Sequence, residues 1–182
     1  AKLLKKNDQK VQTLQTIFDE IPPSAQVLIY GDDLNHLDEL GKELDRMGKY
    51  YFKYTGELDA QKERPTILKE FRQGIRKILL AVGCLDEGID IPACDVAVFI
   101  SSSTSERQFI QRRGRVLRIA PGKTTAWIYD YLVYPILPAS TSDEERRMAL
   151  SMIDAQYRRI NLMVDDAING IREHQKLDQF LS

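Results

Sequence analysis

The sequence predicts an α/β fold in which helices cover both faces of a mostly parallel sheet. Short apolar runs that are typical of buried strands alternate along the chain with segments whose apolar residues recur every three or four positions. Strands and helices that alternate at this pitch form parallel pairs with helical crossovers. The chain has 182 residues, 43% of them hydrophobic, which is enough for a substantial core.

The first half of the chain supplies most of these signals. Residues 8–20 have the spacing of an amphipathic helix, and a buried strand is expected over residues 27–30, bounded by Gly31. Asp32 or Asp33 can cap the next helix. This helix stops at Gly48, and its apolar face consists of Leu37, Leu40, Leu44 and Met47.

The remaining elements of the sheet follow the same alternation. A helix starts near Asp59 or Arg64, with Pro65 in its first turn, and Gly74 ends it. A further helix is expected over residues 106–117. The remaining strands are expected over residues 50–54, 78–82, 96–100 and 125–131.

The last part of the chain differs in pattern. Apolar residues recur at three- and four-residue steps over residues 143–174, which predicts a long amphipathic helix, with a possible break near Asn169-Gly170. We therefore divide the chain into an α/β domain over residues 1–135 and a helical extension over residues 136–182 that packs on it. The alternative is that the extension binds a protein partner.

Composition excludes several classes of protein. The net charge is −1, so any nucleic-acid binding must come from a local patch. Cys84 and Cys94 lack partners with metal-ligand spacing, and we interpret them as small buried side chains. No apolar run is long enough to span a membrane, and a cytoplasmic location is expected, with the nucleoid or nucleus also possible. The start at Ala1, without Met, suggests a piece of a longer protein.

The most basic segment is the run over residues 111–118, with four arginines within seven residues. Arg115 and Arg118 are three residues apart, so on a helix they project from one face. Each guanidinium is a planar fork of donors that keeps its charge, which suits a polyanion. Taken alone, the run could also be a solvated basic helix.

An acidic, glycine-containing turn follows the expected strand over residues 78–82. It reads Glu87-Gly88-Ile89-Asp90. Asp90 could accept a hydrogen bond from a ribose hydroxyl, and Gly88 allows the backbone to approach a ligand closely. Taken alone, the turn could also be an acidic surface turn.

These two segments together resemble motifs V and VI of superfamily 2 helicases and translocases. Residues 27–33 resemble motif IV, and Tyr54-Thr55-Gly56, followed by Glu63-Arg64, resembles the segment between motifs IV and V. The similarity covers about residues 10–135. It is to the C-terminal, second RecA-like domain, nearest the XPB-type and restriction-translocase branches, and it implies a three-layer RecA-like domain.

The resemblance implies roles for the basic run and the acidic turn. Arg115 and Arg118 match the arginine fingers of the family, which stabilise charge on the transferred phosphoryl group. Gln111 matches the position that senses the γ-phosphate. The nucleotide-binding positions of motif V correspond to Glu87, Gly88 and Asp90.

The resemblance also implies contacts to nucleic-acid phosphates rather than to bases. The matching positions are Gly31, Thr55, Gly56, Val82 and Gly83. Val82 stands where the family has a threonine, so this position has no hydroxyl to donate. The branch favours DNA over RNA.

The sequence lacks a Walker A loop and an Asp-Glu Walker B box, and Gly122-Lys123-Thr124 lacks the upstream glycine of a P-loop. We therefore expect no ATP hydrolysis by this chain alone. ATP and Mg²⁺ would be held mainly by an N-terminal RecA-like domain of the same protein. The resulting hypothesis is the C-terminal motor domain of an ATP-dependent DNA helicase or translocase, with DNA repair as one setting. The alternative is a non-catalytic α/β interaction module derived from such a domain.

Overall fold

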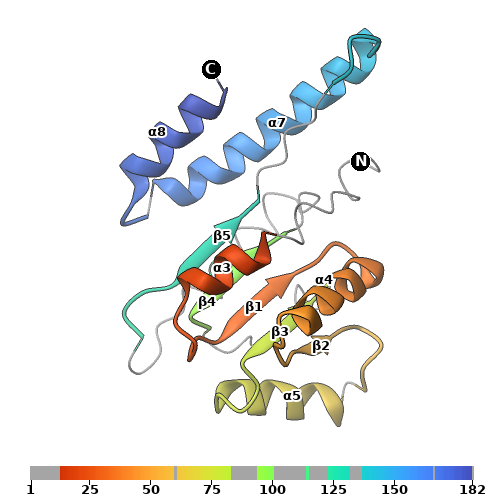
Figure 1. Cartoon of the computed structure of the whole chain (residues 1–182), viewed down its shortest axis with the longest axis vertical. Helices are drawn as coiled ribbons and strands as arrows, with labels where there is room; N and C mark the ends of the chain where they lie inside the picture. Colours follow the sequence, from red (N-terminus) through yellow and green to blue (C-terminus); the bar gives the residue numbers. More distant parts are fainter. Residues whose placement is uncertain are drawn as a thin grey trace. The chain divides into compact units, whose positions relative to one another are not determined.

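The fold is described from a computed structural model of the whole chain (Figure 1). The chain divides into two compact units, Ala1–Tyr131 and Leu132–Ser182. The structure describes residues 13–59, 61–82, 94–100, 114, 123–131, 137–165 and 167–181. Within these ranges, no helix is both long enough and apolar enough to cross a membrane.

The first unit is built on a sheet in which every described pair of neighbouring strands is parallel. Its strand order is β2-β3-β1-β4-β5. The predicted parallel sheet is thus confirmed, although β2 and β5 are shorter than the sequence suggested. The strands are β1 (Val27–Tyr30), β2 (Phe52–Tyr54), β3 (Ile78–Ala81), β4 (Val96–Phe99) and β5 (Trp127–Asp130).

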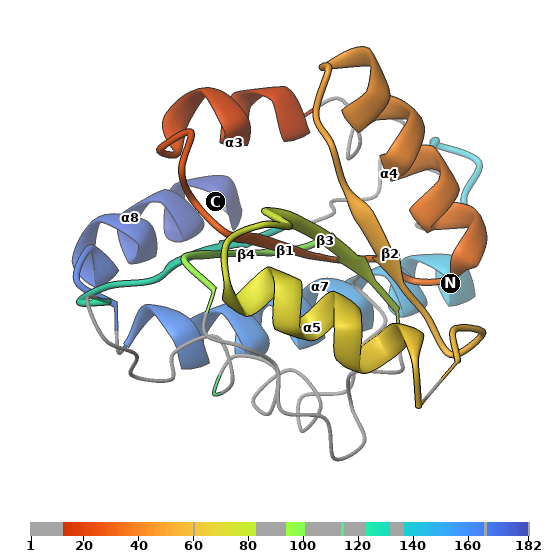
Figure 2. The same ribbon diagram turned by 90° about the horizontal axis from the view of Figure 1, so that it is seen from below.

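Helices lie on both faces of this sheet. Figure 2 shows α3 (Leu14–Glu20) and α4 (Leu34–Arg46) on one face and α5 (Glu63–Arg72) on the other. The predicted helix over residues 106–117 lies outside the described residues, except that Gly114 is helical and exposed. The arrangement is the three-layer form expected when parallel strands are joined by helical crossovers.

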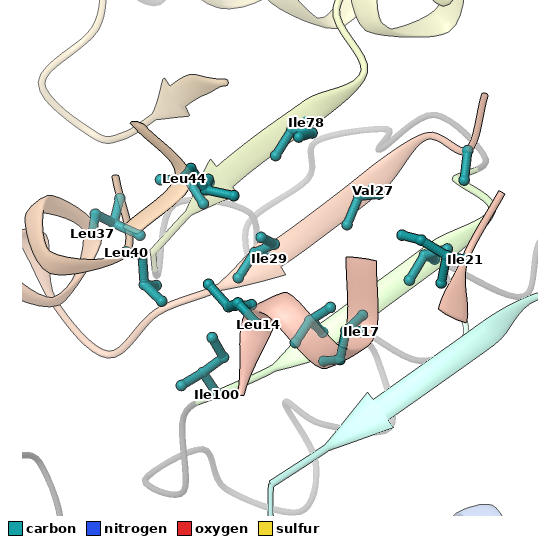
Figure 3. Close-up of a cluster of buried hydrophobic side chains, with 14 residues drawn as sticks. Leu14, Ile17, Ile21, Val27, Ile29, Leu37, Leu40, Leu44, Ile78 and Ile100 are labelled. Atoms are coloured by element: carbon teal, nitrogen blue, oxygen red, sulfur yellow. The ribbon is translucent and has the colours of Figure 1, made fainter. Parts of the chain in front are cut away.

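The core on the α3–α4 side is a single apolar cluster (Figure 3). Alternate strand residues point into it because side chains of a strand alternate between the two faces. Each fully buried aliphatic side chain contributes about 1.5–3 kcal/mol relative to an exposed one. The cluster includes Leu14, Ile17, Ile21, Val27, Ile29, Leu37, Leu40, Leu44, Ile78 and Ile100.

The opposite face of the sheet is equally apolar. Tyr30 and Phe99, paired residues of adjacent strands, stack their rings with centroids 4.9 Å apart. On the same side of the sheet, α5 buries Ile67, Leu68 and Phe71. Burial on both faces explains why β1, β3 and β4 are continuous apolar runs rather than alternating ones.

The helix ends follow the signals in the sequence. The side chain of Asp33 accepts a hydrogen bond from the His36 N–H at 2.9 Å and so caps α4. Gly48 and Gly74 follow α4 and α5 with φ of 63° and 70°, a conformation that favours glycine. These predicted stops are confirmed, and Pro65 lies within the first turn of α5, as expected.

Side-chain hydrogen bonds join α3 to the edge strand β5. The Tyr129 hydroxyl donates to the Glu20 carboxylate at 3.1 Å, and the Thr13 hydroxyl donates to the Tyr131 hydroxyl at 2.6 Å. Burial, reinforced by Glu20, raises the pKa of Tyr129 to about 12. The phenol therefore stays protonated and able to donate at physiological pH.

The second unit contains the long helix that the sequence predicted, here α7 (Asp143–Val164), followed by α8 (Gly170–Leu181). Ser142 and Glu145 form a capping box at the start of α7. The chain reverses between the two helices, where a Cβ on residue 170 would lie 2.2 Å from the Val164 carbonyl oxygen. Glycine at this position thus allows the close approach. The expected packing of the extension on the α/β domain stays a prediction.

Candidate nucleic-acid interface

The carboxyl ends of the strands form one continuous edge. The register pairs Tyr54 with Ala81, Ala81 with Tyr30 and Tyr30 with Phe99, so neighbouring strands end level with one another. Ligands of open parallel sheets bind at this edge, because the loops that leave the strands meet there. The described candidates Gly31, Thr55 and Val82 each lie one residue beyond a strand.

Three adjacent strands thereby bring these candidates together. Thr55 follows β2, Val82 follows β3 and Gly31 follows β1, and these strands are neighbours in the sheet. Neighbouring strands lie about 4.8 Å apart, so the three positions span roughly 10 Å. Sequence alone did not show this row, since Gly31 and Val82 are 51 positions apart along the chain.

Gly31 serves the packing of the sheet. Its N–H donates to the Ala81 carbonyl at 2.9 Å, so this amide is already used within the protein. A Cβ at this position would lie 2.8 Å from Cδ2 of Leu37, a fully buried side chain. Leu37 thus leaves no room for a side chain at position 31, which explains the glycine. Because the Gly31 amide is already used, any phosphate contact in this segment requires another donor.

A buried polar pair follows Gly31. The Asp32 N–H donates to Nδ1 of His36 at 3.3 Å, and the Asp32 carboxylate lies 3.3 Å from the same nitrogen. The side chains of His36 and Asp32 are 6% and 2% exposed. The hydrogen bond from the Asp32 N–H joins the turn after β1 to the first turn of α4. The sequence had suggested no role for His36.

Arg64 is a candidate that the sequence analysis left without a role. Its Nη2 donates to the Gly56 carbonyl at 2.6 Å, which joins the first turn of α5 to the segment after β2. Its Nε is buried and makes no hydrogen bond within the described structure. A guanidinium can bind phosphate oxygens with its remaining donors. The sequence signal is an arginine in the first turn of the helix that follows Thr55-Gly56.

A second set of hydrogen bonds uses the backbone N–H groups at the start of α5. The Asp59 carboxylate accepts from the N–H groups of Gln61 and Lys62, both at 2.8 Å, and the Asp59 N–H donates to Glu63 at 2.8 Å. The beginnings of α4 and α5 both lie at the carboxyl edge, where their dipoles favour an anion. Several of their amides are already occupied, so side chains such as those of Thr55 and Arg64 remain the candidate donors.

Val82 lies at the end of β3 and is partly buried against the apolar core. Its side chain carries no hydroxyl, so at this position only the backbone can contact a phosphate. Thr55, which lies in the same row, does carry a hydroxyl, and this residue is 6% exposed. The row therefore contains one hydroxyl side chain and one apolar one.

The other predicted site residues lie outside the described residues. These are the arginine-finger and γ-phosphate positions, the nucleotide-binding turn and one backbone position: Arg115, Arg118, Gln111, Glu87, Gly88, Asp90 and Gly83. Their roles stay predictions. Within the described residues, no group of His, Cys, Asp or Glu side chains could hold a metal ion.

Cys94 precedes β4 and is fully buried. Burial raises the pKa of its thiol to about 12, so the side chain stays protonated and unreactive. This agrees with the interpretation of Cys94 as a small buried side chain.

A parallel sheet with helices on both faces and candidate ligand-binding residues at its carboxyl edge defines an open α/β domain. Residues 9–120, more than half of the chain, match the helicase conserved C-terminal domain. The chain belongs to this family of superfamily 2 helicase C-terminal domains.

Solved structures agree with the family. The C-terminal domain of the DEAD-box protein Dbp5 superposes with a TM-score of 0.60 at 22% identity, over 84% of this chain and 81% of that one. The Pyrococcus furiosus Hef helicase domain superposes with a TM-score of 0.52 at 27% identity, over 76% of this chain and 28% of that one. The first similarity supports the fold alone.

Curated relatives match shorter segments. Dicer-like protein 2-1 of Aspergillus niger is 47% identical over 58 residues, which are 32% of this chain and 4% of that protein. The DNA 3'-5' translocase XPB2 of Sulfurisphaera tokodaii is 41% identical over 56 residues, which are 31% of this chain and 13% of that protein. This chain thus corresponds to a small part of these relatives.

Proposed function

We propose that this chain is the second motor domain of an ATP-dependent DNA helicase or translocase. In this proposal, an N-terminal RecA-like domain of the same protein holds ATP and Mg²⁺ with its Walker motifs. This chain supplies Arg115 and Arg118 to the phosphates, Gln111 to sense the γ-phosphate, and the turn over residues 87–90 to the nucleotide. Its carboxyl edge contacts the DNA backbone.

One observation carries the proposal. This chain, a member of the helicase C-terminal family, has a row of candidate phosphate-binding residues at the carboxyl edge of its sheet. Thr55 and Gly56 follow β2, Val82 follows the adjacent strand β3, and Arg64 donates a hydrogen bond to the Gly56 carbonyl. The starts of α4 and α5 add partial positive charge. Such an edge suits a sequence-independent grip on phosphates, because hydroxyl groups, guanidinium groups and helix starts all bind phosphate oxygens, and contacts to phosphate carry no sequence information.

The proposal favours DNA because one relative is a DNA 3'-5' translocase. In the two-domain cycle, ATP binding closes the cleft between the motor domains, and hydrolysis reopens it. Differential contacts in the two states would convert this cycle into steps along the strand. Equilibrium binding to DNA and RNA duplexes of equal length and sequence distinguishes the two substrates.

The test of the finger assignment joins an N-terminal RecA-like domain to this chain and measures DNA-stimulated ATPase activity. Arg115→Ala and Arg118→Ala should each lower turnover by about a hundredfold or more, because each removes charge stabilisation of phosphoryl transfer. Arg113→Ala in the same run is the matched control and should leave turnover unchanged. Near-wild-type turnover in both finger variants would refute the assignment.

DNA binding at the carboxyl edge has its own test. Arg64→Lys keeps the charge but loses the planar fork, and it should weaken binding to single- and double-stranded DNA alike. Lys69→Ala, at an exposed position of the same helix, serves as the control. If the Arg64→Lys variant binds DNA with the affinity of the wild type, the proposed contact between the Arg64 guanidinium and a phosphate is wrong. If no DNA binding or stimulation is found at all, the interaction-module alternative replaces the motor proposal.

A further inference from the structure

A concave surface lies at the opposite, amino edge of the same sheet. The loops that lead into β1, β2 and β3 surround a groove of about 350 Å³, here called the amino-edge groove. Because the strands are parallel, this edge lies a full strand length from the carboxyl edge. The groove is lined by Phe18, Ile21, Pro22, Pro23, Ala25, Val27, Gly48, Lys49, Tyr50, Phe52, Ile75, Lys77 and Ile78.

The lining combines apolar side chains with one sign of charge. Among the residues that the structure describes, Lys49 and Lys77 are the charged residues of the lining, and none of the lining residues carries a carboxylate. Tyr50 and Ile75, two of the exposed large hydrophobic residues of the structure, flank the groove at 91% and 69% exposure. Exposed apolar side chains that gather at a concave surface are typical of interaction sites rather than of scattered surface positions.

The groove is held in shape by its own loops. The N–H of Ala25 donates to the Pro22 carbonyl at 2.9 Å, and the N–H of Lys49 donates to the Leu44 carbonyl at 2.8 Å. The ammonium group of Lys49 lies 5.3 Å from the centre of the Phe18 ring. A surface that is already ordered loses little conformational entropy when a partner binds.

A third cation next to the groove is already matched by a carboxylate. Arg76, between Ile75 and Lys77, forms an ion pair with Glu70 and stacks on the Phe52 ring with its guanidinium carbon 3.5 Å from the ring centre. Arg76 is thus matched by a carboxylate, whereas the side chain of Lys77 is exposed. The cations of the described lining are thus Lys49 and Lys77.

We propose that the amino-edge groove binds a segment of a protein partner that carries a large apolar side chain flanked by carboxylates. The apolar side chain enters the groove between Tyr50 and Ile75, and the carboxylates pair with Lys49 and Lys77. A protein segment fits better than a nucleic acid, because the lining is mostly apolar and offers only two cations to a phosphate backbone. The partner would leave the carboxyl edge accessible.

The test uses capped, fluorescein-labelled 12-residue peptides and the full 182-residue chain, with fluorescence anisotropy as the readout. The probes carry a central Leu, Phe or Trp flanked on each side by two glutamates. The comparison peptides carry lysines in place of the glutamates, or alanine in place of the central residue. We expect at least one glutamate probe to bind with a Kd on the order of 10⁻⁵ M, and both comparison peptides to bind at least about tenfold more weakly.

Two variants test the location. Lys77→Glu should weaken the binding of the glutamate probe by about tenfold and strengthen the binding of the lysine peptide. Tyr50→Ala should weaken the binding of both peptides. Lys42→Glu, at an exposed position of α4 outside the groove, is the matched control for charge. Far-UV circular dichroism and thermal unfolding confirm that each variant is folded, as the exposure of Lys77 and Tyr50 predicts.

Three outcomes would overturn the proposal. The first is failure of all glutamate probes to bind at millimolar concentration. The second is binding that Lys77→Glu and Tyr50→Ala leave unchanged. The third is competition of a 12-nucleotide oligo(dT) for the groove with an affinity above that of the peptides, which would assign this surface to nucleic acid.

Discussion

Gly31 provides a sharp test of how the carboxyl edge is built. Gly31→Ala adds one methyl group at the junction of β1 and α4, where the Cβ would lie 2.8 Å from Cδ2 of Leu37. Leu37 is completely buried and belongs to the apolar cluster, so it has little room to move away. The backbone of Gly31 is not in the left-handed region, so the cost should come from the contact alone.

The magnitude follows from the kind of contact. Overpacking a well-packed core costs about 1–3 kcal/mol in the free energy of unfolding. Leu37→Ala, which removes the opposing side chain, costs about 2–5 kcal/mol. In the double variant, the new methyl group occupies part of the space that Leu37 leaves. The double variant should therefore be more stable than the sum of the single changes by about 1 kcal/mol or more.

Urea unfolding followed by tryptophan fluorescence measures these free energies. Trp127 is the only tryptophan of the chain, and it lies in β5, so it reports the first unit. A loss of 2 kcal/mol lowers the urea midpoint by about 1 M when the m-value is ~2 kcal/mol per M. Gly56→Ala is the matched control, because the nearest atom to its Cβ is 3.9 Å away.

The steric explanation predicts a clear difference between the two glycines. Gly56→Ala should change stability by no more than about 0.5 kcal/mol. Additive effects of Gly31→Ala and Leu37→Ala, or an unchanged midpoint for Gly31→Ala, would contradict it. A normally stable Gly31→Ala with weakened DNA binding would show instead that the glycine is needed for the ligand.

The remaining predictions concern ionisation. The Ser142 N–H and hydroxyl both hydrogen-bond the Glu145 carboxylate and lower its pKa below 4.5, so the capping box should stabilise α7 above pH 4.5 and lose this contribution as the pH falls through the lowered value. Carboxyl NMR titration should show that Ser142→Ala, which removes the hydroxyl and keeps the backbone N–H, returns this pKa part of the way toward 4.5, and an unchanged value would show that the hydroxyl does not bind the carboxylate. In a Cys84→Ser variant, Cys94 should resist a thiol reagent at pH 8 until denaturant is added, because burial raises its pKa to about 12. Rapid labelling of the folded variant would show that Cys94 is accessible.

Much of the fold could be predicted from local patterns. The apolar runs of β1, β3 and β4 were recognisable because both faces of a parallel strand are buried. A cap at Asp32 or Asp33 and the stops at Gly48 and Gly74 were recognisable because each depends on the conformation of a few adjacent residues, and the structure assigns the cap to Asp33. The break between α7 and α8 has the same local origin.

The candidate site was only partly predictable. Thr55, Gly56, Gly31 and Val82 were identified through motif resemblance, but not through any property that showed them to be neighbours. Arg64 acquires a candidate role only when its guanidinium is placed against Gly56. Motif resemblance also did not show that the Gly31 amide is used by the sheet.

By itself, the sequence determined most of the described helices and strands, where several of them stop, and which family the motifs resemble. Only the tertiary structure decided the strand order, the level row of candidates at the carboxyl edge and the groove formed by three loops at the amino edge. The reason is physical. Periodicity and capping depend on residues within one or two turns of each other, whereas strand pairing and concave surfaces depend on contacts between residues far apart in the chain.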